Sequence, residues 1–450
     1  MSYDYDLFVI GAGPGGLSAA KQVASYGRRV AIAEQDLVGG TCVIRGCIPE
    51  KLMSFAAEFS EDSQDAAGYG WNQAKNIFDW QQFIAAKEQE IHRLNQVHNQ
   101  AITKAGVELI KGRATFSDAH TLEVAGRQIT ADKVLIAVGA KAVKLEIPGI
   151  EHAITAGQLF NLKQQPKRIA VIGGDYIAVK LAGIIQNLGS QVTQVIPEDH
   201  ILSAFDEDIC GAVTEGMTKR GIQILNNTTV KEINRVGDDI DLVLSSKNQD
   251  ILSVDTVLDG TRRVPNISGL ALEKADIKVT QGRIFVDEYN RTTQANIFAV
   301  GDCINRLNFT PVAIAQGRAF ADTEFGNNPH TVCYECVPAT VSSYPEAATV
   351  GLSEAQAREK FGNSVRCYHS KFRSLVHNLA KRDEKTLIKL VVDNHSDRVL
   401  GAHMVGEGAI EIIQCLALAI RKGATKKDFD TTIGIHPSVA EEFFTLRSFY

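Results

Sequence analysis

A glycine-rich turn between a short apolar strand and a helix is the feature that most constrains the fold of this chain. The segment DYDLFVI leads into GAGPGG, which holds Gly11, Gly13 and Gly16, and the next apolar segment, RRVAIAE, ends at Glu34, 23 residues after Gly11. A dinucleotide fingerprint has this order: the glycines permit a tight turn and close approach of a pyrophosphate, a helix N-terminus faces the phosphates, and the acid accepts the ribose hydroxyls. The sequence therefore predicts a βαβ unit that binds a dinucleotide.

Two cysteines follow this unit directly. Cys42 and Cys47 lie five residues apart in GGTCVIRGCIP. Thiols at this spacing can close a small disulfide, and the glycine beside each leaves room for a flat partner. An arbitrary pair of neighbouring cysteines is more often structural than catalytic, but a dithiol placed directly after a nucleotide fingerprint indicates a redox centre.

The strand, turn and helix recur 162 residues later in PKRIAVIGGDYIAVKLAGIIQNLGSQVTQVIPE. Superposition of the two segments gives four equivalent pairs: Gly11 with Gly173, Gly13 with Asp175, Gly16 with Ala178, and Glu34 with Ile196. The apolar strands, the first glycine and the helix pattern survive in the second segment, so we expect the same fold there. The residues that contact a dinucleotide have changed.

Length and composition indicate a large enzyme without nucleic acid or membrane as a partner. At 450 residues and 44% apolar content, the chain is expected to form about three domains. Its net charge of −6 and spread basic residues argue against nucleic acid. No apolar run approaches the length of a membrane span, and no secretory signal precedes Tyr5. Eight cysteines then favour reduced thiols plus one working pair, so we expect a cytoplasmic protein.

The chain resembles the FAD-dependent pyridine nucleotide-disulfide oxidoreductases of class I, and within them the glutathione reductase group. The resemblance covers nearly the whole chain and is carried, in family order, by GGTCVIRGCIP, VLIAVGAKAVKLEIPG, IFAVGDCINRLNFTPVAIAQGRAF, LVVDNHSDRVLGAHMVGEGAIEIIQ and GATKKDFDTTIGIHPSVAEEF. It implies FAD, an obligate homodimer, and electron flow from a nicotinamide through the flavin to the dithiol and on to a disulfide substrate.

The resemblance also implies a fold. We expect an α/β protein with two three-layer, Rossmann-like dinucleotide-binding domains and a C-terminal α+β dimerisation domain. Along the chain, the expected parts are a first FAD-binding segment with the dithiol at 1–145, an NAD(P)-type domain at 146–265, a second FAD-binding, central segment at 266–330, and the interface domain at 331–450.

The resemblance assigns the catalytic roles to four residues. Cys42 would be the interchange thiol that attacks the substrate, and Cys47 the thiol that contacts the flavin. His436 and Glu441, in HPSVAEE, match an element that reaches the dithiol of the partner subunit. An imidazole there can keep one cysteine as a thiolate and protonate the leaving thiol, while the carboxylate fixes its tautomer. A monomer would then be inactive.

Further residues match positions that contact FAD. Thr41 lies beside the dithiol, Gly301 and Asp302 end the segment IFAVGD, and Thr310 with Pro311 opens a helix whose N-terminal dipole would face the flavin pyrimidine. Tyr176 falls where relatives place an aromatic gate over the flavin, although ordinary core packing is an equal alternative.

A lysine and a glutamate that pair beside the flavin in glutathione reductases are exchanged in this chain. Their positions hold Glu50 and Lys180, so the predicted ion pair would be kept with its direction reversed. In the alternative, the neighbouring Lys51 takes the lysine role, as the spacing in lipoamide dehydrogenases suggests.

Two basic residues match positions that bind the substrate. Arg318, in QGRAF, falls on an arginine that relatives use for a glutathione carboxylate, and Lys21 falls on a second basic position. Both are equally compatible with plain charges on a helix surface. Pro14 departs from the serine common in glutathione reductases. Glutathione disulfide is therefore the default small-disulfide substrate, and a protein dithiol is the alternative.

The nicotinamide site departs most from the family pattern, because Asp175 replaces the glycine that touches pyrophosphate. Repulsion between two unit charges about 4 Å apart is roughly 1 kcal/mol in water and about 4 kcal/mol at a partly buried site. Since about 1.4 kcal/mol is tenfold in affinity, this change alone predicts a loss of tenfold to several hundredfold.

Other nicotinamide contacts are missing as well. The two arginines of NADPH users fall on Pro197 and Ser203, the acid of NADH users falls on Ile196, and the ATGR turn reads GTRR at 260–263. We therefore expect weakened or abolished binding of both NADPH and NADH. In the alternative, Arg262 or Arg263 compensates by binding a phosphate.

Three functions remain open from the sequence. The first is a glutathione reductase-like enzyme, the second a flavin dithiol oxidoreductase that uses another redox partner, and the third a non-catalytic flavoprotein paralogue. Cys333 and Cys336, in CYEC, lie outside the family pattern and are interpreted as plain thiols, with a second dithiol relay or half of a metal site as the alternatives. No second CxxC completes a zinc site, so we expect no metal.

Overall fold

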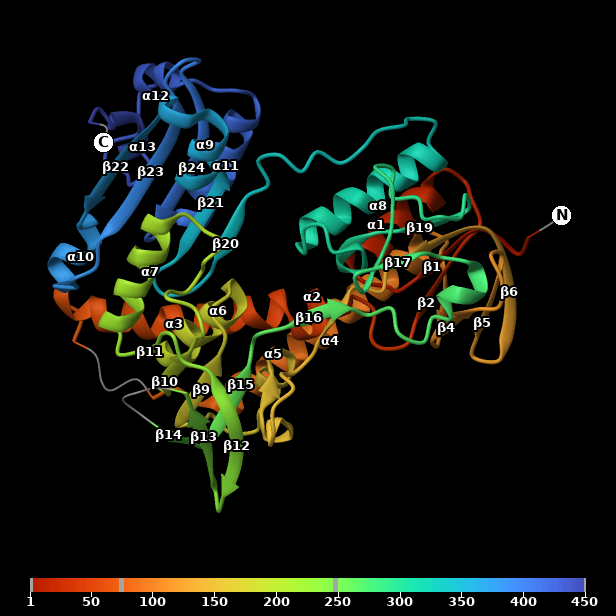
Figure 1. Ribbon diagram of the computed structural model, residues 1–450, viewed down its shortest axis with the longest axis horizontal. Helices are drawn as coiled ribbons and strands as arrows, with labels where there is room; N and C mark the ends of the chain where they lie inside the picture. The colour runs from red at the N-terminus through yellow and green to blue at the C-terminus, as the bar shows by residue number, and fades with distance from the viewer. Residues whose placement is uncertain (1–2, 73–76, 246–249, 449–450) are drawn as a thin grey trace. The chain divides into compact units, whose positions relative to one another are not determined.

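The computed structural model of the chain describes residues 3–72, 77–245 and 250–448 (Figure 1). Its internal packing forms two compact bodies. The first body comprises Met1–Glu50, Gln81–Val143 and Arg262–Cys333, and the second comprises Lys51–Trp80, Lys144–Thr261 and Tyr334–Tyr450. The four-part division expected from the sequence stays a prediction.

A seven-stranded sheet forms the centre of the first body, in the order β3-β2-β1-β6-β5-β4, with β19 also paired to β6. Strands β3, β2, β1, β6 and β19 run parallel to their neighbours, whereas β4, β5 and the start of β6 form an antiparallel meander. The strands are β1 (Tyr5–Ile10), β2 (Val30–Glu34), β3 (Glu108–Lys111), β4 (Ala114–Phe116), β5 (Thr121–Val124), β6 (Arg127–Ile136) and β19 (Ile297–Ala299).

Successive residues of β1 point to opposite faces of this sheet, because side chains alternate along a strand with a period of two. Leu7 and Val9 pack with helices α1 and α8, whereas Phe8 and Ile10 pack with the meander. The other elements of this body are α1 (Pro14–Ser25), α2 (Gly40–Arg45), α4 (Trp80–Lys104), α8 (Thr310–Glu324), the pair β7 (Ala140–Ala142) and β16 (Arg263–Pro265), the pair β17 (Val279–Thr280) and β18 (Arg283–Ile284), and the 3₁₀ turns η3 (Leu272–Ala275) and η4 (Gly301–Ile304).

The second body contains a parallel five-stranded sheet in the order β11-β10-β9-β15-β8. An antiparallel sheet, β12-β13-β14, packs against one of its faces through a shared apolar cluster. The elements are β8 (Ile154–Thr155), β9 (Arg168–Ile172), β10 (Gln191–Val195), β11 (Gln223–Leu225), β12 (Val230–Val236), β13 (Asp239–Leu244), β14 (Ile251–Val254), β15 (Thr256–Asp259), α5 (Ala156–Leu159), α6 (Tyr176–Asn187), α7 (Glu207–Lys219) and η2 (Ile150–His152).

The C-terminal part of the second body is an antiparallel sheet, β20-β21-β24-β23-β22, covered by α11. The strands predicted in TLIKLVVD and VLGAHMVG are β23 and β24, and their residues Ile388 and Leu390 pack with Ile413 of α11. The elements are β20 (Ala339–Val341), β21 (Ala347–Gly351), β22 (Val365–Phe372), β23 (Thr386–Asp393), β24 (Arg398–Val405), α9 (Glu354–Phe361), α10 (Leu375–Ala380), α11 (Ala409–Arg421), α12 (Lys426–Thr431), α13 (Glu442–Thr445), η1 (Ala67–Tyr69) and η5 (Gly362–Ser364).

Two sheets with the strand, glycine turn and helix order, followed by this α+β domain, confirm the predicted α/β fold.

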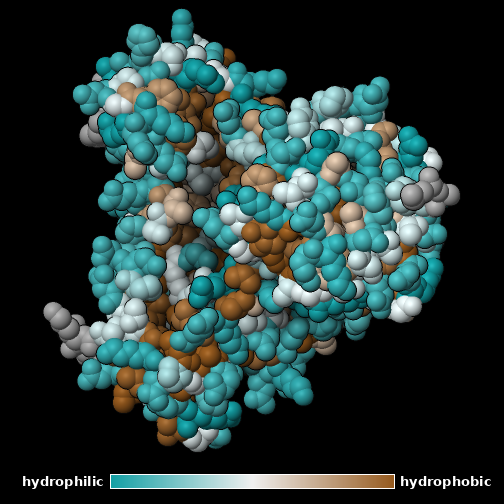
Figure 2. All heavy atoms as spheres, turned by 45° about the vertical axis from the view of Figure 1, so that its right-hand side comes forward, coloured by the Kyte–Doolittle hydropathy of each residue, from teal (hydrophilic) through white to brown (hydrophobic). Residues whose placement is uncertain are grey.

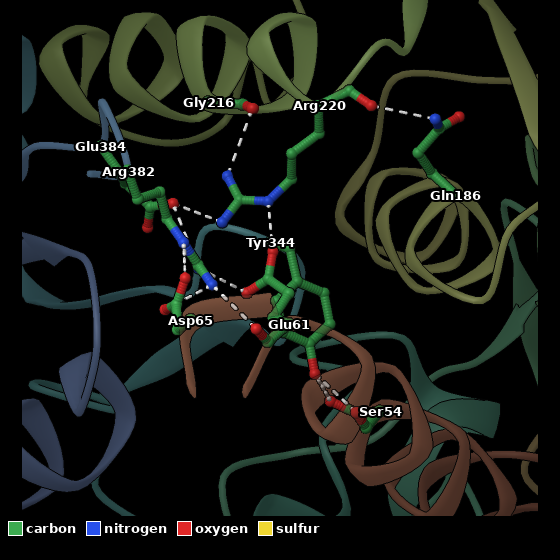
Figure 3. Close-up of polar contacts among 9 residues, drawn as sticks. All are labelled: Ser54, Glu61, Asp65, Gln186, Gly216, Arg220, Tyr344, Arg382 and Glu384. Atoms are coloured by element: carbon green, nitrogen blue, oxygen red, sulfur yellow. Dashed lines mark hydrogen bonds and ion pairs between the residues drawn. The ribbon is translucent and has the colours of Figure 1, made fainter. Parts of the chain in front are cut away.

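Helix α3 (Cys47–Ala66) begins at a cysteine and is held near its other end by a cluster of ion pairs (Figure 3). Arg220, at the end of α7, lies 2.6 Å from Glu61, and Arg382 lies 2.8 Å from Glu61 and 2.7 Å from Asp65. Burial alone would raise the pKa of Glu61, but the two guanidinium groups lower it below its usual value. Glu384 also pairs with Arg220, and it lies 3.9 Å from Arg382.

Residues of the described ranges form no helix that is both long and apolar enough to span a bilayer. On the face shown in Figure 2, hydrophilic residues predominate and hydrophobic residues gather in separate patches.

Candidate functional site

The first glycine turn follows β1 and permits no side chain at two of its positions. Gly11 has a φ of +103°, and a Cβ on it would lie 2.6 Å from the Ala137 carbonyl oxygen. A Cβ on Gly16 would lie 2.1 Å from the Gly11 carbonyl oxygen. The two predicted glycines are therefore required for the close packing of α1 on the turn.

Helix α1 begins with an N-terminus that no side chain caps. Gly13 is the N-cap residue and Pro14 follows in the first turn. Because the first N–H groups of a helix lack partners within it, this end can accept an anion. The nearest atom to a Cβ built on Gly13 is the Gly40 Cα, 3.9 Å away, so the space above the turn is open. These features fit the pyrophosphate of FAD.

Glu34 ends β2 and reaches back to the same turn. Its Oε2 accepts a hydrogen bond from the Ala12 N–H at 2.8 Å, and its Oε1 accepts one from the Asp36 N–H at 2.9 Å. Burial raises the pKa of this carboxyl. The acid therefore lies at the turn, as the prediction for ribose binding requires.

The two cysteines of the predicted dithiol lie together with Thr310. Cys42 is a half-buried residue of α2, and Cys47 is the exposed first residue of α3. The Cys47 sulfur is 3.8 Å from the Thr310 hydroxyl at the start of α8. A hydrogen bond with Cys47, followed by burial, raises the pKa of the Cys42 thiol. Thr41 packs against Gly46, where a Cβ would lie 2.9 Å from the Thr41 carbonyl oxygen.

The predicted residues Gly301 and Asp302 lie at the start of η4. The Gly301 N–H donates to Gln316 Oε1 at 2.7 Å, and Gly301 has a φ of +78°. Burial raises the pKa of Asp302, and Arg263, 3.3 Å away, opposes that shift. Sequence reasoning did not identify Gln316, and it offered Arg263 only as a phosphate ligand.

The two candidate substrate residues are exposed on helices that pack closely. Lys21 lies on α1 and Arg318 on α8. A Cβ on Gly317 would lie 2.4 Å from the Gly15 carbonyl oxygen, so the two helix backbones are in direct contact. Burial, and then the charge of Lys21, lower the pKa of His98 on α4, a residue that sequence reasoning did not single out.

The second glycine turn repeats the backbone of the first. Gly173 has a φ of +120°, and its N–H donates to the Val195 carbonyl at 3.0 Å. The equivalent Gly11 N–H donates to the Ala33 carbonyl at 2.9 Å. The predicted second βαβ unit, β9-α6-β10, is therefore confirmed as a fold.

Asp175 caps α6 with its side chain. One carboxylate oxygen accepts hydrogen bonds from the Ile177 N–H at 2.9 Å and the Ala178 N–H at 3.1 Å. These are helix N-terminal donors of the kind that bind a phosphate in dinucleotide folds. An aspartate directly before an apolar helix is an N-cap signal. Sequence reasoning considered only that this residue adds a side chain and a negative charge beside a pyrophosphate, and it missed the cap.

In each unit, a helix residue faces the residue that follows a neighbouring strand, and the two units differ in which of these two residues carries a methyl group. In the first unit, a Cβ on Gly16 would approach the Ala137 methyl to 3.2 Å. In the second unit the helix residue is Ala178, and the residue after the neighbouring strand is Gly260, whose built Cβ would lie 3.1 Å from the Ala178 methyl. Gly260 therefore makes room for the alanine that replaced the third fingerprint glycine.

The three nucleotide positions at the end of β10 and in the segment after it hold no basic group. Ile196 is fully buried, and Pro197 and Ser203 are exposed. Lys180 is buried on α6 with its Nζ 5.3 Å from the centre of the half-buried Tyr176 ring.

The two residues of the predicted exchanged ion pair belong to different bodies. Glu50 is in the first turn of α3 and belongs to the first body, and Lys180 belongs to the second. Lys51 lies over the Phe55 ring at 4.6 Å and partly offsets the burial that raises the pKa of Glu346. Both the exchanged ion pair and the Lys51 alternative stay predictions.

His436 and Glu441 form the predicted imidazole–carboxylate pair. The His436 Nδ1 lies 3.0 and 3.1 Å from the two carboxylate oxygens of Glu441. The Ser438 N–H and then His436 lower the pKa of Glu441. The imidazole side chain is 81% exposed. With Nδ1 bound to the carboxylate, Nε2 is the ring nitrogen left to exchange a proton.

The CYEC cysteines show no partner set for a metal. Cys333 is exposed, and Cys336 is half-buried with a φ of +55°. Among the described residues no three His, Cys, Asp or Glu side chains are grouped so that they could hold a metal ion.

Residues 5–317 match the family described as pyridine nucleotide-disulphide oxidoreductase, and residues 337–447 match its dimerisation domain. The chain is 53% identical to a glutathione reductase of Nostoc sp. over 99% of this chain and 100% of the relative. It is 47% identical to a glutathione reductase of Burkholderia cepacia, with 99% of each chain covered. It is 39% identical to the chloroplastic/mitochondrial glutathione reductase of Pisum sativum, over 99% of this chain and 83% of the relative. On this evidence, the chain belongs to the pyridine nucleotide-disulphide oxidoreductase family.

Proposed function

We propose that this enzyme reduces a small disulfide, with glutathione disulfide as the default substrate, through the Cys42–Cys47 pair. The proximity of the two thiols beside Thr310 at the start of α8 is the observation that carries the proposal. The curated relatives named above are glutathione reductases, which supports the choice of substrate.

The reaction balances with these residues. The Cys42 thiolate attacks one sulfur of the substrate disulfide, which forms a mixed disulfide and releases the first thiol with a proton from His436 of the partner subunit. The partner's His436, now neutral, takes the proton of the Cys47 thiol, and the resulting thiolate attacks Cys42, which closes the Cys42–Cys47 disulfide. The imidazole then gives this second proton to the second thiol as it leaves. Two electrons and two protons have then reached the substrate, and the protein disulfide must be reduced again.

FAD, when bound, supplies the two-electron carrier that reduces the protein disulfide again. The uncapped α1 N-terminus, Glu34 at the turn, and Gly301 with Asp302 would hold it. Thr310, at the N-terminus of α8 and 3.8 Å from the Cys47 sulfur, would orient the ring system beside the thiol.

We further propose that binding of NADPH or NADH is weakened in this chain. The Asp175 carboxylate accepts N–H donors at the α6 N-terminus and adds a negative charge where a pyrophosphate would lie. Of the two arginines that could compensate, Arg263 already pairs with Asp302, which leaves the exposed Arg262 as the better candidate. In the alternative, the enzyme is independent of nicotinamide, and its donor would be a protein dithiol, a ferredoxin or another redox partner.

A non-catalytic paralogue is the weaker alternative, because the chain keeps Cys42, Cys47, His436 and Glu441. The enzyme would act as a homodimer, since His436 must reach the dithiol of the second subunit, and the matched dimerisation domain supports this. The cytoplasmic location stays a prediction.

An anaerobic titration of the purified yellow protein with NADPH and then NADH, monitored by flavin absorbance, tests the electron donor. Dithionite serves as the positive control. Reduction by dithionite but by neither nicotinamide at stoichiometric amounts supports a weakened second site, whereas rapid reduction by either nucleotide contradicts it. Glutathione disulfide turnover with a chemical donor, and its loss in both Cys42→Ser and Cys47→Ser, tests the substrate and the dithiol.

A further inference from the structure

The segment that follows β10 places an acid beside the second glycine turn, although the expected strand-end position holds Ile196. A Cβ built on Gly174 would lie 3.6 Å from Glu198 Oε2. The segment is fixed by its backbone, because the Ile196 and Glu198 carbonyls accept hydrogen bonds from the Thr228 and Asn227 N–H groups at 2.9 and 3.0 Å.

The first βαβ unit shows what a carboxylate in this place does. Glu34 Oε2 accepts the Ala12 N–H, and Ala12 is equivalent to Gly174 by the shift of 162 residues. The carboxylate of Glu34 is hydrogen-bonded to Ala12, and the carboxylate of Glu198 lies beside the equivalent Gly174, so each unit has an acid near the same position of its turn. In dinucleotide folds the acid at this point accepts hydrogen bonds from the ribose hydroxyls of the adenosine half.

A second observation at the same turn concerns Gln194 of β10. Its Nε2 donates to the Gly173 carbonyl at 2.7 Å, and the side chain is fully buried. Its Oε1 has no hydrogen-bond partner among the described residues. Gln194 therefore belongs to the packing beneath the turn, and the exposed Glu198 carboxylate is the side-chain acceptor beside it, which suits hydroxyl donors and not a phosphate.

We propose that Glu198 replaces the strand-end acid of the second βαβ unit and makes that unit selective for NADH over NADPH. The inference rests on the proposed function, in which the unit still binds a nicotinamide nucleotide weakly. Glu198 would accept hydrogen bonds from the 2′- and 3′-hydroxyls of the adenosine ribose. A 2′-phosphate would meet the same carboxylate with like charge, and the basic residues that would neutralise it are absent at Pro197 and Ser203.

Binding of the oxidised nucleotides NAD⁺ and NADP⁺ to the FAD-loaded enzyme, measured by calorimetry, tests the proposal without turnover. The Asp175→Gly background raises both affinities into a measurable range if the capping carboxylate weakens the site. In that background we expect NAD⁺ to bind more tightly than NADP⁺. Glu198→Gln should strengthen NADP⁺ binding by about tenfold, as expected for removal of one close like charge.

The neighbouring Asp199→Asn variant is the matched control, since it removes an equal charge from the next exposed residue. It should change the ratio of the two affinities by less than about twofold, because solvent screens a charge that does not contact the ligand. Flavin content and dimer mass, measured for each variant, identify any that fail to fold.

The outcomes separate the two proposals. A rise in both affinities on Asp175→Gly with no preference for NAD⁺, or with equal effects of Glu198→Gln and Asp199→Asn, overturns the role of Glu198 alone. A clear preference for NAD⁺ in the wild type, with no gain on Asp175→Gly, overturns the weakened site and keeps the role of Glu198. Binding of neither nucleotide in any variant overturns the inference, because the unit then has no nucleotide to select.

Discussion

The two βαβ units of this chain have the same turn and different helix ends. In both, the first glycine has a positive φ, and its N–H donates to the second strand of the unit. At the next position the first unit has Gly13, which leaves the α1 N-terminus without a side-chain cap, and the second has Asp175, which accepts two N–H groups of α6. The comparison shows that the geometry of the turn is kept when the residue at the helix N-cap changes from glycine to aspartate.

Packing explains why the fold survived these changes. The third fingerprint glycine became Ala178, and the volume of its methyl is accommodated by Gly260 on the neighbouring strand end. The cap supplied by Asp175 itself stabilises the helix, since replacing an N-cap aspartate by alanine costs roughly 1 kcal/mol. The departures from the fingerprint at positions 175 and 178 therefore need not have cost stability.

The largest expected effect comes from placing the aspartate of the second unit at the equivalent position of the first unit. Gly13→Asp should lower FAD affinity by about tenfold to several hundredfold, because its carboxylate would cap α1 and repel the pyrophosphate. The backbone at Gly13 is extended and its Cβ would meet nothing closer than 3.9 Å, so the fold should tolerate the change. Flavin retained after dialysis measures the effect, with Gly13→Ala as the uncharged control. Equal flavin retention by the two variants would contradict the comparison.

The reverse change should have a similar or smaller effect. Asp175→Gly frees the α6 donors and removes the charge, so we expect nicotinamide nucleotides to bind about tenfold or more tightly. Asp175→Asn keeps a capping oxygen and removes only the charge. If the asparagine variant binds as tightly as the glycine variant, charge alone weakens the site; if it binds as weakly as the wild type, occupation of the donors does. Titration of the flavin absorbance with NADH distinguishes these results.

The compensation between Ala178 and Gly260 predicts a smaller effect, which is on the free energy of unfolding. Gly260→Ala would bring two methyl groups to about 3.1 Å, and such overpacking costs on the order of 1 kcal/mol. In the Ala178→Gly background the same substitution should cost nothing, because the opposing methyl is absent. Urea unfolding of the four members of this double-mutant cycle measures the coupling. Additive losses would show that Gly260 does not compensate for Ala178.

The smallest predicted effect concerns the acid that the second unit lacks at its strand end. Burial raises the pKa of Glu34 in the folded chain, so the folded state holds its proton more tightly than the unfolded state. The stability that this gives is present below the ordinary value of 4.5 and is lost as pH rises through the folded pKa. Flavin-free Glu34→Gln should therefore be more stable than the wild type near pH 7, by less than about 1 kcal/mol.

Below about pH 4.5 the stabilities of the Glu34→Gln and wild-type chains should converge, since Glu34 is then protonated in both the folded and the unfolded state. Denaturant titrations at a series of pH values check this. A difference that stays constant across the series would assign the effect to packing and not to charge.

The sequence predicted the elements that depend on short runs of neighbouring residues. The strands that end at Ile10 and Ile172, the glycine turns and the helices behind them follow from apolar runs and turn residues, and they are confirmed. The Cys42–Cys47 pair was predicted from its spacing and position, and its two thiols lie within hydrogen-bonding contact.

Features that depend on distant residues could not be predicted in the same way. Glu61 pairs with Arg220 and Arg382, which are 159 and 321 positions away in the chain. Glu198 reaches the turn only because the residues after β10 pair with Asn227 and Thr228. Neither arrangement has a local pattern that a sequence shows.

The Asp175 side chain that caps α6 also competes with a nucleotide for the N–H groups at the start of the helix, and its local concentration there does not change with dilution. A carboxylate attached to the chain faces the helix N-terminus at an effective concentration fixed by covalent geometry, whatever the level of free nucleotide. A nucleotide that binds must first displace it, so the cap raises the concentration needed for half-saturation and leaves the rate at full saturation unchanged. Occupancy would still rise hyperbolically with nucleotide concentration, so Asp175 would lower the turnover supported by a given level of nicotinamide nucleotide without blocking it.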